Sequence, residues 1–363
     1  MSALTLPSGS PRALQKLLDD FTAGRKAALA RAVSMVEDGR AGADLLLAAL
    51  HSRVGRARRI GLTGPPGAGK STLTTRLAAA LREQGHTVGI VAVDPTSPFS
   101  GGALLGDRVR MEAVALDPGV FIRSMATRGS LGGLAGTTRE VCDLLDAFGL
   151  DRILIETVGV GQSELDIART ADTSLLVLVP EAGDSIQTLK AGLMEVADVF
   201  VVNKADRPGA DRLRNDIDLM LGLRGGHALK DIPAHHGVDL RKLGSRAAPP
   251  VPADDGEERW AQPVLRAVGT TGEGLPEVLA ALDAHYAYLE RSGHLEVRRR
   301  ARLRERVKDV VFQRLARRLW NDADTNAWID AQVADLAAGR MTPYAVADAL
   351  LRQSGPLMTG DTA

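Results

Sequence analysis

The sequence predicts an α/β fold in which a mostly parallel β-sheet is covered by helices on both faces. Two observations lead to this prediction: short, continuously apolar segments alternate with helical stretches, and a glycine-rich turn joins the first of them to a helix. Strands that are apolar throughout are buried on both faces, which is typical of parallel sheets flanked by helices. At 363 residues the chain is long enough for about two domains, or for one large domain with appendages.

The predicted elements follow in chain order. Residues 12–51 are expected to be helical, because leucine, alanine and valine recur there at intervals of three and four. The predicted strands are Arg59–Thr63, Thr87–Val93, Val120–Arg123, Arg152–Thr157, Leu175–Pro180, Val199–Asn203 and Val264–Val268. The other predicted helices are Ser71–Gln84, Ala135–Phe148, Ser163–Ala171, Leu275–Leu289, a stretch from His294 onward, and Pro343–Gln353.

Composition favours a protein of the cytoplasm. Lysine plus arginine number 45 and aspartate plus glutamate number 45, so no overall positive charge would attract nucleic acid or a membrane surface. No apolar run reaches the roughly 18 residues of a membrane-spanning helix, and the polar segment Met1–Pro11 lacks a signal core. Cys142 is the single cysteine, which excludes an internal disulfide, and its apolar helical neighbours favour core packing.

A glycine-rich segment follows the first predicted strand and opens the next helix. It reads Gly64, Pro65, Pro66, Gly67, Ala68, Gly69, Lys70 and Ser71, which fits the pattern G-x-x-x-x-G-K-[ST]. Glycine lets the backbone direct several N–H groups at one phosphate, and the helix start adds positive charge. Lys70 is expected to reach the β- and γ-phosphates and the Ser71 hydroxyl to coordinate Mg²⁺, with Thr72 beside them. We call Gly64–Ser71 the phosphate loop.

A second motif indicates which base is bound. Asn203, Lys204 and Asp206 form N-K-x-D at the end of an apolar strand, the edge where open parallel sheets bind ligands. A carboxylate there can accept from N1–H and the amino group of guanine, whereas adenine would leave it unpaired. Asn203 would contact the other edge of the ring and the Lys204 stem its face. The tetrapeptide also occurs in surface turns, but its position downstream of the phosphate loop favours guanine. We call Asn203–Asp206 the base loop.

Carboxylates at further strand ends are candidate metal ligands. Asp94 follows the second predicted strand, Glu156 lies near the end of the fourth, and Asp107 lies between them. Mg²⁺ on a nucleotide needs one or two protein carboxylates, so some of these would act through water. Asp107 could equally cap the start of a helix. Gly159, shortly after Glu156, would let a backbone N–H approach the γ-phosphate and distinguish GTP from GDP.

Longer motifs resemble the methylmalonyl-CoA mutase-associated GTPases, a family also labelled arginine/ornithine transport ATPase or kinase. The likeness runs from about residue 12 to residue 320. Besides the two loops it rests on Asp94–Met111, Glu156–Glu164 and Glu181–Lys190. The resemblance implies a phosphate-loop GTPase fold and a homodimer that hydrolyses GTP to GDP and phosphate. Such enzymes act as chaperones of adenosylcobalamin-dependent acyl-CoA mutases, because they gate cofactor loading and protect the mutase from inactivation.

The resemblance also assigns a metal site and a fifth guanine-binding element. The implied Mg²⁺ positions are Ser71, Asp94, Asp107 and Glu156. Gly269 and Thr270 fall on the fifth element. Here Val268–Gly274 reads Val-Gly-Thr-Thr-Gly-Glu-Gly, where the family usually has Ser-Ala-x-x-Gly-Glu-Gly. The departure lies at the residues that would contact the base.

A switch segment that responds to the mutase is implied at Glu181–Lys190, with Gln187 and Lys190 at its partner-sensitive positions. No residue is clearly placed to orient the attacking water, and Gln162 is a weak candidate for that role. Lys190 follows glycine and aspartate in this segment, which motivates the hypothesis that it acts as a cation that enters when the mutase binds. The expected catalytic residues are Lys70, Glu156 and Lys190.

Three parts of the chain are predicted: a helical extension over 1–55, a phosphate-loop GTPase domain over 56–290 with an insertion at about 207–262, and a helical dimerisation arm over 291–363. The insertion contains His235 and His236, which would face opposite sides of a strand, so a solvated loop is favoured over a metal site.

The start of the arm is strongly basic. Leu295–Arg318 carries ten Lys/Arg against three acids, and nucleic-acid binding is one interpretation. The apolar stripe through the segment favours instead an amphipathic helix packed on a partner subunit, with its arginines outward.

Two other functions agree with a phosphate loop. A small-molecule kinase would prefer ATP and transfer phosphate to an amino acid, and the base loop argues against it. A nickel- or cobalt-insertion GTPase would need clusters of cysteine and histidine, whereas Cys142 is isolated. The resemblance implies that the client of the chaperone is methylmalonyl-CoA mutase or a relative that isomerises another branched acyl-CoA.

Overall fold

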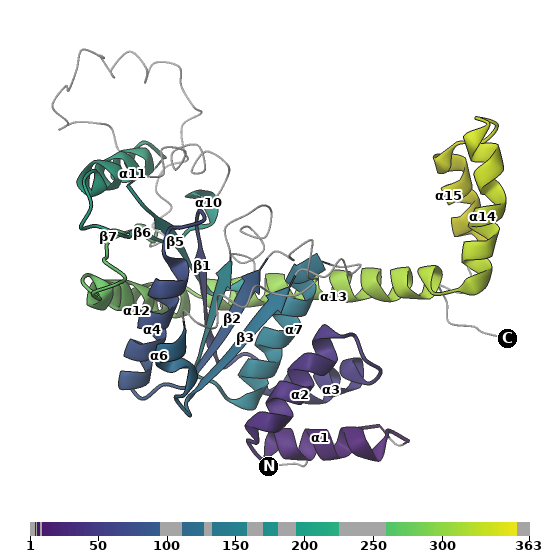
Figure 1. Ribbon diagram of the computed structural model, residues 1–363, viewed down its shortest axis with the longest axis horizontal. Helices are drawn as coiled ribbons and strands as arrows, with labels where there is room; N and C mark the ends of the chain where they lie inside the picture. Colours follow the sequence, from purple (N-terminus) through teal and green to yellow (C-terminus); the bar gives the residue numbers. More distant parts are fainter. Residues whose placement is uncertain are drawn as a thin grey trace.

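The computed structural model describes residues 4, 6–7, 9–94, 111–126, 133–157, 170–180, 194–224 and 259–353. Within them a seven-stranded sheet has the order β3-β2-β4-β1-β5-β6-β7, and every pairing between neighbouring strands is parallel. The strands are β1 (Arg58–Thr63), β2 (Val88–Asp94), β3 (Val120–Ala126), β4 (Arg152–Thr157), β5 (Thr173–Leu178), β6 (Val199–Val202) and β7 (Val264–Arg266). Helices cover both faces, which confirms the predicted fold class (Figure 1).

The helices fall into three groups along the chain. The N-terminal group is α1 (Arg12–Thr22), α2 (Lys26–Glu37) and α3 (Ala43–Leu50), followed by the short 3-10 helix η1 (His51–Arg53). Those around the sheet are α4 (Lys70–Glu83), α6 (Glu112–Ala115), α7 (Gly133–Phe148), α10 (Met194–Val196), α11 (Ala210–Arg224) and α12 (Leu275–Arg291). The C-terminal group is α13 (His294–Trp320), α14 (Ala323–Ala337) and α15 (Pro343–Gln353). Residues 163–169 of the predicted helix Ser163–Ala171 lie outside the described residues.

Alternate residues of the central strands pack into different cores. Leu154 of β4 packs with α4 and α12 on one face, while Ile153 and Ile155 pack with α7 on the other. All three side chains are fully buried. Successive strand side chains point to opposite faces, so a strand covered on both must be apolar without interruption. The apolar runs in the sequence therefore reflect the two layers of helices.

The N-terminal helices share a core with α7. The rings of Phe21 in α1 and Phe148 in α7 meet edge to face, with centroids 5.2 Å apart. The buried carboxylate of Asp146 in α7 accepts hydrogen bonds from the backbone N–H groups of Gly55, Arg56 and Ala57, at 2.8–3.0 Å. The segment that leads into β1 is thus fixed to the same helix that α1–α3 cover.

The predicted insertion begins with a regular helix. Residues 210–224 form α11, whose Leu213 and Ile217 are buried in a cluster with Phe200 of β6 and Val264 of β7. No helix was predicted from the sequence over this stretch, because only a few apolar residues anchor an otherwise polar helix. His235 and His236 lie outside the described residues.

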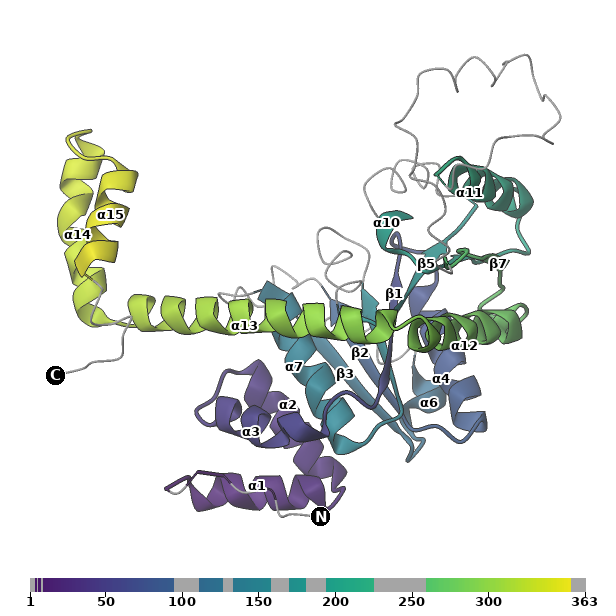
Figure 2. The same ribbon diagram turned by 180° about the vertical axis from the view of Figure 1, so that it is seen from behind.

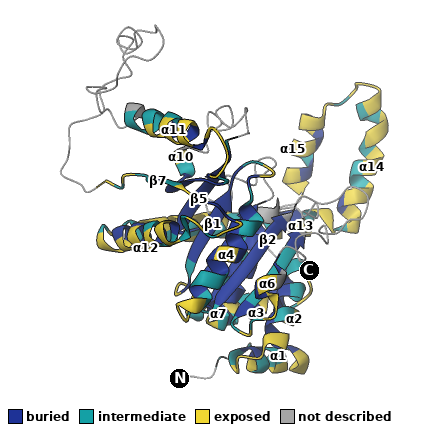
Figure 3. Cartoon of the chain, turned by 60° about the vertical axis from the view of Figure 1, so that its left-hand side comes forward, coloured by how far each residue is buried: buried dark blue, intermediate teal, exposed yellow. Residues whose placement is uncertain are grey.

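α13 leaves the globular part of the molecule. It has 27 residues, or about 40 Å at 1.5 Å per residue. Figure 2 shows it crossing the sheet and continuing beyond it to α14 and α15, which lie side by side at its far end. The surfaces of α14 and α15 are largely exposed (Figure 3). Among the described helices, none combines the length and apolar character needed to cross a membrane.

The prediction that the arginines of this segment point outward is wrong for the first turns of α13. Arg298 binds Asp198 at 2.9 Å, and Arg299 and Arg302 bind Asp172, so these side chains face the chain's own sheet. A buried carboxylate is stable only when it is paired, which explains their direction. The exposed large apolar side chains of α13 are Val297, Leu303, Val307, Val311, Phe312, Leu315 and Trp320.

Acid should weaken this docking of α13. Burial alone would raise the pKa of Asp172, but the charges and hydrogen bonds of Arg302 and Arg299 outweigh it and hold that pKa below its ordinary value. A lowered folded-state pKa means that the stabilisation is complete above the unfolded pKa of about 3.9 and is lost as the pH falls through the folded value. We expect Asp172→Asn to lower the free energy of unfolding at pH 7 by roughly 3 kcal/mol and to flatten its decline below pH 4, measured by urea unfolding. The exposed Asp330→Asn is the control, and an equally steep acid decline in both variants would contradict the prediction.

Candidate functional site

The phosphate loop joins the end of β1 to the start of α4, as predicted. Gly64, Gly67 and Gly69 adopt φ values of 138°, 74° and 83°, a region that favours glycine. A Cβ atom at Gly64 would lie 2.0 Å from the carbonyl oxygen of Val177 in β5, and one at Gly69 would lie 2.4 Å from Nδ2 of Asn203. Backbone conformation therefore requires glycine at all three positions, and close approach requires it as well at Gly64, next to β5, and at Gly69, next to the base loop.

Lys70 is the first residue of α4 and is only 5% exposed. Its Nζ donates to the carbonyl oxygens of Gly64 at 2.7 Å and Pro65 at 2.9 Å, so the ammonium lies within the curve of the loop. The N-terminal N–H groups of α4 and this ammonium together make the loop strongly electropositive. An anion with several oxygens, such as a polyphosphate, matches that field.

Ser71 and Glu156 meet where β1 and β4 run side by side. Leu62 of β1 is in register with Glu156, and the Ser71 hydroxyl donates to Oε1 of Glu156 at 2.5 Å. Glu156 is 4% exposed. A hydroxyl and a carboxylate in contact offer the oxygen ligands that Mg²⁺ prefers. These two residues fit the predicted metal site.

The remaining predicted ligands cannot be placed as fully. Asp94 ends β2, which is the neighbour of β4, so its backbone lies at the correct edge of the sheet. Asp107, the fourth predicted ligand, lies outside the described residues. The same holds for residues predicted in other roles: Gly159, Gln162, Gln187 and Lys190. Among the described residues, no group of three or more His, Cys, Asp or Glu side chains could hold a metal ion.

Asn203 links three parts of the site. Its Nδ2 donates to the carbonyl oxygen of Ala68 in the phosphate loop at 2.7 Å, and its Oδ1 accepts from the N–H of Gly269 at 3.0 Å. The side chain is buried. An amide carries two N–H donors and two acceptor lone pairs, so one of each is used inside the protein. Contact with the guanine ring, the role predicted from the sequence, would use the second N–H donor and the second acceptor lone pair of this amide.

Removal of this amide should loosen the site. Asn203→Ala leaves the Gly269 N–H and the Ala68 carbonyl buried without partners, which costs about 1–3 kcal/mol in the free energy of unfolding. Urea unfolding at pH 7 measures the change. Asn326→Ala is the matched control, because this exposed asparagine also binds two backbone carbonyl groups but lies in α14. Equal losses from the two substitutions would show that Asn203 has no special structural role.

The rest of the base loop and the fifth element lie next to each other. Lys204 has φ 55° and is the one non-glycine residue with positive φ in the described part of the chain. Strained conformations of this kind concentrate at functional sites. The N–H of Ala205 donates to the carbonyl of Ala267 at 3.1 Å, which places Gly269 beside the base loop, and Asp206 is exposed. The predicted loops are thus brought together at the carboxyl ends of β1, β4 and β6.

Sequence reasoning missed two features around the site. Arg76 of α4 donates to the carbonyl oxygen of Thr270 at 2.5 Å and so ties the phosphate helix to the fifth element. The second feature lies at the opposite ends of the strands, where Asp172 precedes β5 and Asp198 precedes β6. An aspartate directly before an apolar run is a visible signal for the second feature, whereas nothing in the sequence indicates the first.

The fold and site define a class of protein. A parallel sheet with a glycine-lined cradle after β1, an oxygen pair between β1 and β4, and N-K-x-D after β6 makes this protein a phosphate-loop GTPase. The chain belongs to the methylmalonyl-CoA mutase-associated GTPase family MeaB, whose family model matches residues 29–324. It is a GTP hydrolase of that family.

Individual relatives extend over nearly the whole chain. A Pyrococcus horikoshii protein that carries a GTPase name is 42% identical over 340 residues, which span 94% of this chain and 98% of the relative. The mitochondrial methylmalonic aciduria type A homolog of Mus musculus is 32% identical over 94% of this chain and 79% of its own length. A solved structure described as an LAO/AO transport system kinase covers 95% of this chain and 99% of its own, with a TM-score of 0.63 and 25% identity.

Proposed function

We propose that this GTPase is a chaperone of an adenosylcobalamin-dependent acyl-CoA mutase, methylmalonyl-CoA mutase or a relative, and that GTP binding and hydrolysis gate cofactor loading and protect the mutase. The observation that carries the proposal is the match to a mutase-associated family over residues 29–324. The name of the mouse relative, which refers to methylmalonic aciduria, agrees with it. The sequence motif Glu181–Lys190 is the segment expected to respond to the client.

Hydrolysis is assigned to the groups at the strand ends. The phosphate loop and Lys70 bind the β- and γ-phosphates and counter the negative charge that develops during attack by water. Ser71 and Glu156, with Asp94 and Asp107, would hold Mg²⁺, which neutralises phosphate oxygens when bound. Asp206 reads guanine, and the Asn203 amide fixes the base loop to the phosphate loop. The phosphate loop and the base loop would therefore keep a fixed relative position when GTP binds to both.

A homodimer in the cytoplasm is part of the same proposal. The side chains of Leu303, Val307, Val311 and Leu315 recur every four residues along α13 and are all exposed. Side chains four apart form a ridge on a helix that packs into the groove of another helix. A second copy of α13 supplies such a groove, so this stripe is assigned to the dimer interface.

Metal insertion, the second candidate, receives little support from Cys142. The thiol is fully buried, and burial raises its pKa to about 12, so it would not form the thiolate that binds nickel or cobalt. The described residues offer no other cluster of the kind. A kinase would prefer ATP and transfer its phosphate to an amino acid, so a comparison of the affinities for ATP and GTP separates a kinase from a GTPase.

The chaperone proposal predicts mutual effects with a mutase. Addition of a purified adenosylcobalamin-dependent mutase captured from the same cell extract should raise the rate of GTP hydrolysis, and the GTPase should slow the inactivation of that mutase during turnover. Lys190→Ala should remove the stimulation, while exposed Lys16→Ala should not. The proposal is wrong if no mutase is captured from the extract and if mixing the GTPase with methylmalonyl-CoA mutase changes neither the rate of GTP hydrolysis nor the rate of mutase inactivation.

A further inference from the structure

Two aspartates lie at the amino ends of the neighbouring strands β5 and β6, whereas the nucleotide site lies at the carboxyl ends of the strands. Asp172 precedes β5 and is 1% exposed, and Asp198 precedes β6 and is 7% exposed. We call them the strand-start aspartates. Most buried carboxylates in proteins serve a binding partner or a network, because an isolated one is too costly to bury. Here the described residues show such a network: backbone N–H groups and arginines of α13 contact both carboxylates, and His285 also lies 3.2 Å from Asp198.

Each strand-start aspartate joins its own strand to a neighbour in the sheet: Asp172 joins β5 to β1, and Asp198 joins β6 to β5. The carboxylate of Asp172 accepts from the N–H of Arg59 in β1 at 3.0 Å, and its own N–H donates to the carbonyl of Arg59 at 2.8 Å. Asp198 repeats the arrangement with Ser174 of β5, with both distances between 2.8 and 2.9 Å. The starts of β1, β5 and β6 are thereby fixed against one another.

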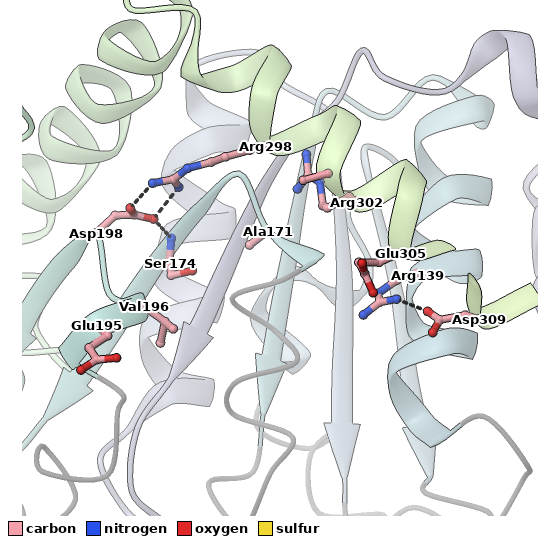
Figure 4. A pocket seen from close by; sticks show the side chains of 11 residues that line it. Arg139, Ala171, Ser174, Glu195, Val196, Asp198, Arg298, Arg302, Glu305 and Asp309 are labelled. Atoms are coloured by element: carbon pink, nitrogen blue, oxygen red, sulfur yellow. Dashed lines mark hydrogen bonds and ion pairs between the residues drawn. The ribbon is translucent and has the colours of Figure 1, made fainter. Parts of the chain in front are cut away.

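α13 holds this connection from outside the sheet. Arg299 and Arg302 bind the carboxylate of Asp172, and Arg298 binds Asp198 at 2.9 and 3.2 Å and the Asp172 carbonyl at 2.9 Å. Figure 4 shows Arg298 reaching Asp198, whose carboxylate also accepts from Ser174. Arg299 additionally donates to the carbonyl of Gly55, before β1, at 2.6 Å. One helix therefore contacts the starts of three adjacent strands.

The same strands carry the two ends of the nucleotide site. β1 has six residues and leads into the phosphate loop, and β6 has four and leads into the base loop. At about 3.3 Å per residue, these strands span roughly 13–20 Å. Since the strands are hydrogen-bonded in a fixed register, a displacement at the start of β6 relative to β1 reaches the base loop at its end.

We infer that Arg298, Arg299 and Arg302 of α13 are positioning residues for guanine recognition: through the strand-start aspartates they hold the starts of β1, β5 and β6 in their relative positions and so set the offset between the phosphate loop and the base loop. A ligand that spans both loops depends on that offset, whereas a ligand held by its phosphates alone does not. The inference rests on the assignment of Asp206 to the base.

A purely structural role for the arginines gives a different result. Loss of a docking contact lowers the fraction of folded protein, and this reduces the apparent binding of every nucleotide by the same factor. A change of offset weakens the binding of GDP, whose base is recognised, more than it weakens the binding of ADP, whose base is not recognised. The ratio of affinities for GDP and ADP separates the two, because it does not depend on the folded fraction.

The test uses the full chain with Arg298→Gln, and Arg304→Gln as matched control. Arg304 lies on the same helix but is exposed, so both variants lose one positive charge from α13. Calorimetry gives the affinities for GDP and ADP. We expect Arg298→Gln to lower the preference for GDP at least tenfold, Arg298→Lys to restore part of it, and Arg304→Gln to stay within twofold of the unaltered protein. An unchanged preference in Arg298→Gln overturns the inference.

Two further measurements complete the test. If Arg298→Gln does not fold, hydrogen exchange on the unaltered protein replaces that variant. GDP should slow the exchange of the Ser174 and Arg59 N–H groups at the strand starts, and no slowing there overturns the inference.

Asp206→Asn tests the assignment of the base loop separately. A changed base preference in Asp206→Asn with none in Arg298→Gln rejects the positioning role alone, whereas no change in either rejects the assignment of the base loop as well.

Discussion

Replacement of Lys70 by alanine is expected to lower the rate of GTP hydrolysis by roughly 10²–10³-fold, the usual loss when one preorganised donor to a developing charge is removed. The reason is its position: the ammonium is buried inside the phosphate loop, 2.7 Å from the carbonyl oxygen of Gly64, at the positive end of α4. Single-turnover hydrolysis at saturating GTP measures the effect on the chemical step, and nucleotide titration measures the effect on binding.

The matched control for this prediction is Lys26→Ala. Lys26 also donates to a backbone carbonyl, that of Val120 at 3.0 Å, but it lies in α2 away from the loop. Its removal should leave hydrolysis within twofold. Lys70→Arg should be nearly as inactive as the alanine variant, since a planar guanidinium cannot occupy a space shaped for a compact ammonium. A rate near that of the unaltered protein in either Lys70 variant would contradict the assignment.

The positions of the strands along the chain were predictable, because a strand that is buried on both faces is a continuous run of apolar residues in the sequence. Arg152–Thr157 was predicted with the bounds that the structure gives to β4, and the other strand predictions differ by a few residues at their ends. The phosphate loop was predictable for a related reason: glycine is needed at positions of positive φ and close approach, and no other residue satisfies both.

The direction of α13 was not predictable from its own sequence. Its apolar stripe stays exposed within the single chain, where Leu303 and Val307 are more than half exposed, whereas the arginines of its first turns dock on the sheet. The partner of Arg302 is Asp172, 130 residues earlier in the chain, and no local period indicates a pairing at that distance. α11 was missed for a comparable reason, because its burial comes from contact with β6 and β7.

The site was predictable in its members and less so in how they are joined. The two loops and Glu156 meet as the motifs indicated, because parallel strands bring their carboxyl ends to one edge. The bridge from Asn203 to Ala68 and Gly269 was not foreseen, since the amide was assigned to the base. A motif names residue types, whereas the allocation of each donor and acceptor depends on contacts that only the folded chain makes.

Substitution of Asp206 by asparagine should change which base the enzyme accepts. In the proposed contact the carboxylate accepts from N1–H and from the amino group of guanine. Asparagine keeps one acceptor for N1–H but presents N–H donors to the amino group, so GTP binding should fall by roughly 10³-fold or more, as expected when a site made for a donor loses its acceptor. Xanthine has an oxygen where guanine has the amino group, and the asparagine N–H can donate to it. XTP should therefore bind Asp206→Asn more tightly than GTP does.

This exchange tests chemistry without disturbing the fold. Asp206 is exposed, and asparagine has nearly its shape, so the free energy of unfolding should change by no more than about 0.5 kcal/mol. Competition between GTP and XTP in calorimetry gives the ratio directly, and Asp324→Asn, an exposed change at the start of α14, should leave it unaltered. Because the phosphates are bound identically in both nucleotides, any reversal of preference must arise at the base. Retention of GTP preference by Asp206→Asn would place guanine recognition elsewhere, with the backbone around Gly269 as the remaining candidate.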